Sequence, residues 1–197
     1  MSSCIHLSSI LALLVASLAA PNATARMSPQ ENINSAINEA SATQHTFDFN
    51  QLTTRDTFTT ETGYGFDLGT IPNSSEPKPF YFSVAVPEGN YKVTVTFGDT
   101  AASSANSLKA ESRQLLLEHL TTLHGELITR SFIVNVRTPQ IPPPEKNAPG
   151  GASVVLNNRE TGLLRWDGKL TLEFNGAAPR VHSVTIEPVS VPTLYLA

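Results

Sequence analysis

The chain has 197 residues, of which 40% are hydrophobic and 15% charged, and its formal net charge is −4. This length suits one domain of ordinary size with extensions at its ends. The mild acidity and the lack of a block of basic residues argue against nucleic acid and against an anionic membrane surface as partners.

Residues 1–25 have the composition of an export signal. Leu7–Ala20 is a run of apolar and small residues, and Ala23-Thr24-Ala25 has the small-x-small pattern of a cleavage site. The sequence therefore predicts a signal peptide that is cut after Ala25, and a secreted or periplasmic protein. The apolar run is short for a membrane span. The residues before this run include no lysine or arginine, which leaves a retained membrane anchor as the alternative.

Beyond this leader the predicted mature chain has no cysteine, because Cys4 is the single one. It would therefore contain no disulfide and no thiolate metal site. Residues 26–45 are polar and include few bulky side chains. They predict a flexible spacer, with a short helix as the alternative.

From residue 46 onward the sequence has the two-residue periodicity of β-strands. Phe47 and Phe49 flank Asp48, and Tyr81–Val86 is a β-rich run that ends at a Pro-Glu-Gly-Asn turn signal. Apolar and polar residues then alternate over Tyr91–Phe97. We expect the two runs around the turn to form a hairpin with one buried face.

The segment Leu108–Leu123 is the most ambiguous part of this pattern. It contains good helix formers, and Leu116, Leu120 and Leu123 fit a helical stripe. In a chain that otherwise shows strand periodicity, we favour one long strand over a helix.

The second half of the chain continues the pattern of short strands and turns. Strands are expected over Glu126–Arg137, Val154–Leu156, Leu163–Trp166, Leu170–Phe174 and Val181–Ile186, with a proline-rich loop over Thr138–Gly151 and turns at Asp167-Gly168 and Asn175-Gly176. About eight short strands with little helical periodicity predict an all-β fold, an antiparallel β-sandwich over residues 46–190.

Gly98-Asp99-Thr100, directly after an expected strand, is the one candidate for a nucleophile turn. It resembles a Gly-Asp-Ser turn with threonine in place of serine. No Asp-x-x-His sequence is present to supply a base, and no Gly-x-Ser-x-Gly elbow occurs. We therefore interpret Asp99 and Thr100 as a polar loop and expect no catalytic residue in this chain.

Metal ligation has weak support in the sequence. His119 and His124 are five positions apart, so they diverge on a strand and on a helix alike. No cofactor is expected. A structural calcium ion bound by loop carboxylates remains open, with Asp48, Asp67 and Asp167 as its candidate ligands.

Carbohydrate binding would need an exposed aromatic ring beside polar groups. Tyr64 and Trp166 are the candidate rings, and Glu111 and Arg113 are the candidate polar partners. Tyr64 lies between two glycines, which indicates an exposed loop. Trp166 follows two leucines within the sequence LLRW, so a place in the core or in an interface is the alternative for it.

Three blocks of the sequence resemble a known family when taken in order. Pro79–Asp99, Leu108–Glu118 and Leu163–Gly176 are similar to the N-terminal β-sandwich of bacterial rhamnogalacturonan acetylesterase-like proteins, which are exported carbohydrate esterases of the GDSL/SGNH hydrolase superfamily. The resemblance covers residues 46–197. It implies a galactose-binding-like, jelly-roll sandwich that precedes a catalytic α/β domain.

The resemblance also gives a meaning to Val191–Ala197, with the sequence VPTLYLA. In the family a similar strand leads directly to the Gly-Asp-Ser or Gly-Asn-Ser turn of the catalytic domain, which here would begin after Ala197. No catalytic residue of the family is found at any position of this chain.

These inferences predict a non-catalytic accessory module that binds carbohydrate or braces a catalytic domain, in a chain truncated before that domain. Its partners would be pectic polysaccharide or an SGNH domain, with no nucleic acid, and with no membrane after the signal is cleaved. The alternative is a structural module that pairs with a separately encoded SGNH domain. An active enzyme ranks last for this chain alone.

Overall fold

The computed structural model describes residues 43–73, 76, 78–112, 114–141, 152–162 and 164–192. The signal peptide predicted for residues 1–25, nearly all of the spacer predicted for residues 26–45, and residues 193–197 of the expected terminal strand lie outside the described residues.

The described residues form strands and one short 3₁₀ turn. The elements are β1 (His45–Asp48), β2 (Tyr64–Asp67), β3 (Phe80–Ala85), β4 (Gly89–Gly98), β5 (Ser104–Ala110), β6 (Gln114–Thr122), β7 (Leu127–Val136), η1 (Leu164–Trp166), β8 (Lys169–Ala178) and β9 (Val181–Pro188). The prediction of an all-β fold is confirmed.

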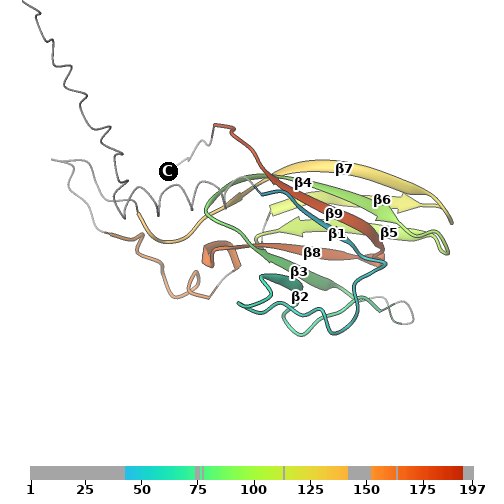
Figure 1. Cartoon of the computed structure of the whole chain (residues 1–197), viewed down its shortest axis with the longest axis horizontal. Coiled ribbons are helices and arrows are strands. Elements are labelled where there is room, and N and C mark those ends of the chain that lie inside the picture. Colours follow the sequence, from blue (N-terminus) through green and yellow to red (C-terminus); the bar gives the residue numbers. More distant parts are fainter. Residues whose placement is uncertain are drawn as a thin grey trace, which may run out of the picture.

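The strands form two antiparallel sheets that lie face to face (Figure 1). One sheet has the strand order β1-β9-β4-β7, and the other has the order β2-β3-β8-β5-β6. Each sheet joins strands that are far apart in the sequence, since β1 pairs with β9 and β8 lies between β3 and β5. The fold is therefore a β-sandwich, as predicted.

The core lies between the two sheets and follows the alternation of the strands. Val93, Val95 and Phe97 of β4 are fully buried from one side, and residues at every second position of β8 are fully buried from the other. The β8 residues are Leu170, Leu172 and Phe174. Burial of one such side chain contributes about 1.5–3 kcal/mol to the free energy of unfolding. These two strands therefore supply much of the apolar contact that holds the sheets together.

The predicted hairpin of Tyr81–Val86 and Tyr91–Phe97 is wrong. These segments are β3 and β4, and they belong to different sheets. β3 pairs with β2 and β8, whereas β4 pairs with β7 and β9. Residues 86–88 link β3 to β4 and carry the chain across the sandwich, and both strands face the same core from opposite sides.

The segment Leu108–Leu123 is extended, as favoured, but it is not one long strand. It contains the end of β5 and all of β6, and these two strands pair with each other as a hairpin. The chain reverses at Glu111 and Ser112, whose φ angles are +52° and +65°. Residues other than glycine rarely adopt this left-handed backbone conformation, so the residue types Glu and Ser gave no indication of a turn here.

Three further local predictions are corrected. Val154–Leu156 forms no strand, and Val155 is 93% exposed. Leu164–Trp166 is a 3₁₀ turn instead of a strand. Asn175-Gly176 does not reverse the chain but lies within β8, where the pairing with β5 shifts register. At Gly176 φ is +121°, and a Cβ atom would collide with the carbonyl of Ala105.

Candidate functional site

The two glycines beside Tyr64 had indicated an exposed loop, but Tyr64 lies on strand β2. It pairs with Val84 of β3, and its ring centroid is 5.0 Å from that of the core residue Phe47. The side chain is 38% exposed. Tyr64 therefore covers the margin of the core, and one edge of its ring reaches solvent.

Trp166 lies in η1, before the start of β8, with a charged side chain against its ring. The guanidinium carbon of Arg137 is 4.5 Å from the ring centroid, a cation–π contact. The indole Nε1 is buried without a hydrogen-bond partner. One face of this ring is therefore occupied by Arg137, which leaves less of the indole for a sugar than the sequence suggested.

Glu111 is a structural part of the hairpin end. Its N–H donates to the carbonyl of Thr171, and its Oε1 accepts from the N–H of Thr171, each at 3.0 Å. The residue is 6% exposed, and Oε2 is buried without a partner. Burial raises the pKa of Glu111 to about 8, and the charge of Asp167 acts in the same direction. Glu111 is thus poorly placed to contact a ligand.

The structure brings Glu111 and Trp166, two of the four predicted sugar-binding residues, to one end of the sandwich. Arg137 lies near both, because it contacts the ring of Trp166 and its charge acts on Glu111. Arg113, another of the four, lies outside the described residues. Tyr64, Glu111 and Trp166 do not form an open aromatic platform.

The aspartates considered for calcium have protein partners. Asp67 accepts hydrogen bonds from Ser83 Oγ and Lys169 Nζ, each at 2.6 Å, and Asp48 accepts from Asn50 and Gln51. Burial alone would raise the pKa of Asp67, but the hydrogen bonds from Lys169 and Ser83 lower it. Across the part of the chain that the structure describes, no three metal-ligating side chains gather.

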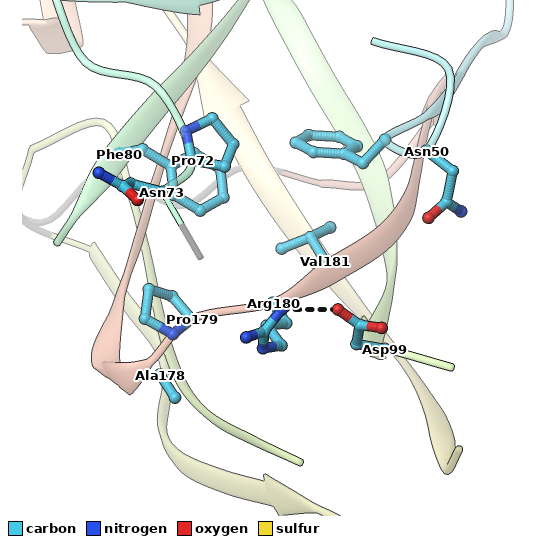
Figure 2. Close-up of a pocket in the computed structure, with 10 residues that line it drawn as sticks. Asn50, Pro72, Asn73, Phe80, Asp99, Ala178, Pro179, Arg180 and Val181 are labelled. Atoms are coloured by element: carbon cyan, nitrogen blue, oxygen red, sulfur yellow. Dashed lines mark hydrogen bonds and ion pairs between the residues drawn. The ribbon is translucent and has the colours of Figure 1, made fainter. Parts of the chain in front are cut away.

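A cleft opens at the other end of β8, where the two sheets meet (Figure 2). It has a volume of about 170 Å³. Its lining residues come from the links that follow β1, β2, β4 and β8 and from the strand ends beside them: Phe49, Asn50, Pro72, Asn73, Phe80, Asp99, Ala178, Pro179, Arg180 and Val181. Apolar rings and polar side chains thus share one hollow.

Asp99 and Arg180 form an ion pair in this cleft, drawn as a dashed line in Figure 2. Arg180 Nη1 donates to Asp99 Oδ2 at 2.7 Å, and the N–H of Ala101 donates to Asp99 Oδ1 at the same distance. The bond from Ala101 and then the one from Arg180 lower the pKa of Asp99. Asp99 is therefore a fixed carboxylate.

The backbone holds this pair in place from both sides. The N–H of Arg180 donates to Asn106 Oδ1 at 2.7 Å, and its carbonyl accepts from the N–H of Gly98 at 3.0 Å. Gly98 has a φ of +114°, and a Cβ atom there would collide with the carbonyl of Glu126. Only glycine fits at this position, so Gly98 fixes the backbone conformation from which the Asp99 loop begins.

Two amides lie at other parts of the rim. Asn50 Nδ2 donates to Asp48 Oδ1 and lies 3.0 Å from His182 Nδ1. Asn73 Oδ1 accepts from the N–H of Glu76 at 3.1 Å. Figure 2 shows Asn73 beside Pro72, apart from Asp99 and Arg180. The cleft therefore presents donors and acceptors around an apolar floor.

Sequence reasoning missed this cleft. It identified Asp99 and Thr100 as a polar loop after a strand, and the structure places both directly after β4. Nothing in the sequence joined that loop to Arg180, which is 81 positions away, or to Asn50 and Asn73. The pairing of β1 and β4 with β9 brings these segments together, and that pairing carries no local sequence signal.

No helix in the described ranges has the length and apolar character to cross a membrane. No protein-family model matches the chain, and no curated protein matches it. Among solved structures, the chain is similar to the YxiM protein of Bacillus subtilis, with a TM-score of 0.42 and 18% sequence identity. The alignment covers 75% of this chain and 40% of the YxiM chain, so this chain spans less than half of that protein's length.

Proposed function

We propose that this chain is a non-catalytic accessory module of an exported rhamnogalacturonan acetylesterase-like hydrolase, and that it binds carbohydrate in the Asp99–Arg180 cleft. The sandwich would be of the galactose-binding-like, jelly-roll type. The resemblance of Pro79–Asp99 and Leu163–Gly176 to that family supports the assignment of class.

One observation carries the proposal: polar side chains surround an apolar floor in the cleft. Phe49, Pro72 and Pro179 offer apolar surface, whereas Asp99 and Arg180 offer an acceptor and a donor. A pyranose ring has an apolar face and a rim of hydroxyl groups that each need a partner. The cleft has both kinds of surface within a volume suited to a single sugar unit.

Binding to soluble pectic polysaccharides by affinity electrophoresis tests this function. Retention is expected for the wild type and is expected to fall in Asn50→Ala and Asn73→Ala, because each removes a polar group from the rim. Glu187→Gln is the matched control, since Glu187 pairs with Lys92 on the outer face of β4 and β9, at the end of β9 away from Arg180. Equal retention of all four proteins would contradict the proposed site, and no retention of any would contradict carbohydrate binding.

The second candidate is a structural module that pairs with a separately encoded SGNH domain. The contact of Arg137 with Trp166 favours it, because Trp and Arg are common at the centre of protein interfaces. A pull-down with such a domain is then expected to succeed with the wild type and to weaken in Arg137→Ala. Capture that is unchanged in Arg137→Ala would exclude this surface.

A further inference from the structure

The cleft contains one positive and one negative side chain. Arg180 and Asp99 are 25% and 28% exposed, respectively, and are joined at 2.7 Å. The other residues of the lining are amides and apolar side chains. The cleft therefore has no net charge, and the partial burial of the pair strengthens each of its hydrogen bonds.

Asp99 would lose hydrogen bonds if its carboxylate moved away from Arg180. Its two oxygens accept from Arg180 Nη1 and from the N–H of Ala101. Nearby, Asp48 and His182 both contact Asn50, and the charge of His124 lowers the pKa of Asp99 in the same direction as that of Arg180. Asp99 thus stays as a carboxylate facing the cleft.

We propose that the Asp99–Arg180 cleft selects an uncharged sugar unit and rejects a uronate, an inference that rests on the carbohydrate binding proposed above. A uronate carboxylate would lie against the Asp99 carboxylate, or would have to displace Asp99 from Arg180. A hydroxyl group avoids both costs, because it donates to a carboxylate oxygen that has a free lone pair and accepts from an amide or guanidinium N–H.

The matched probes are methyl galactoside and methyl galacturonoside, which differ only at C6, and the corresponding glucose pair. Binding is followed by the movement of backbone and side-chain amide signals in nuclear magnetic resonance spectra of the labelled chain. In the wild type, the neutral member of a pair is expected to bind at least roughly tenfold more tightly than its uronate, because like charges oppose binding.

Asp99→Asn tests the cause by exchanging the charge for an amide of the same shape. Arg180 is then unopposed, so binding of the uronate is expected to rise by roughly tenfold and that of the neutral sugar to fall. Glu187→Gln removes the same charge from the outer face of β9, at the end away from Arg180, and is expected to change neither. Thermal unfolding of each variant confirms that it is folded.

The outcomes separate the two proposals. Wild-type binding of a uronate that is as tight as binding of its neutral partner overturns the charge preference and leaves carbohydrate binding intact. An equal rise of uronate binding in Asp99→Asn and Glu187→Gln also overturns it, because overall charge would then be the cause. No shift with any of the four sugars or with the pectic polysaccharides overturns both proposals.

Discussion

Glu111 keeps a carboxyl group in a place where the described residues offer it a single hydrogen-bond donor. The N–H of Thr171 reaches Oε1, and among those residues Oε2 is buried without a partner. A buried acceptor without a donor costs about 1–3 kcal/mol, and more when it is charged. A proton on Glu111 removes the charged part of that cost, and for this reason burial raises its pKa to about 8.

This proton makes the stability of the fold depend on pH. Between the ordinary value of 4.5 and the folded-state value of about 8, the folded chain holds a proton that the unfolded chain has released. The free energy of unfolding therefore falls as pH rises through this window, by up to about 1.4 kcal/mol per pH unit from this group. Glu111→Gln is expected to remove that slope and to exceed the wild type in stability at pH 8.5.

Urea unfolding of both proteins from pH 4.5 to 8.5 measures the effect. Glu187→Gln serves as a control, because the Glu187 carboxyl is 35% exposed and paired with Lys92, and it is expected to keep the wild-type slope. Identical slopes in the wild type and in Glu111→Gln would mean that Glu111 does not hold this proton.

At the scale of the elements, one glycine permits the close approach of two strands. Gly176 lies inside β8, where the register with β5 shifts between Ala105 and Ser107. The backbone of β5 approaches so closely that no Cβ atom fits. Beyond Gly176, β8 continues to Ala178, and Arg180 follows in the cleft.

Gly176→Ala is expected to destabilise the fold by roughly 3 kcal/mol, from the left-handed backbone and the collision with Ala105 together. Gly69→Ala is the matched control, since its φ is also positive, at +69°, but its surroundings are open. That change is expected to cost only about 1 kcal/mol. Equal losses in thermal unfolding would show that the close approach of β5 does not matter.

The same elements show how far the sequence could predict this molecule. Alternation correctly placed β4 at Tyr91–Phe97 and β8 at Leu170–Phe174, because a half-buried strand carries its own pattern. The partners of those strands could not be predicted, because a strand with one face in the core has the same apolar–polar alternation in either sheet. This explains why β3 and β4 were expected to pair.

The candidate sites follow the same rule. Glu111 and Trp166 were singled out by residue type, whereas the burial of Glu111 and the contact of Trp166 with Arg137 depend on β8 and on the chain after β7. The ion pair of Asp99 with Arg180 depends on the approach of β4 to β9, so no local pattern could signal it.

At the scale of the whole molecule, one edge of the sandwich is notably apolar. Within the described residues, β6 pairs with β5 alone and β7 with β4 alone, so each has an open edge. Leu115 of β6 and Leu123, in the turn that follows β6, are 55% and 75% exposed, and Ile133 of β7 is 43% exposed. Long apolar edges favour association between chains.

We expect the chain to self-associate through this edge. Leu115→Lys combined with Leu123→Lys is expected to yield a monomer, because charges on an edge strand oppose pairing. Val155→Lys is the control, since Val155 is more exposed but lies outside β6, β7 and the turn between them. Sedimentation velocity distinguishes the states. A wild type that stays monomeric at high concentration would contradict the prediction.

The pairing of β1 with β9 has a consequence for how this unit can be joined to others. These are the first and last strands of the described sandwich, and His45 lies opposite Ile186. Entry and exit of the fold are therefore neighbours, so a host protein could carry the whole sandwich between two adjacent residues of a surface loop. A circular permutant that joins these ends by a short linker would need little rearrangement. Because its two ends are neighbours, the sandwich could be inserted within a longer chain as well as placed at either end of one.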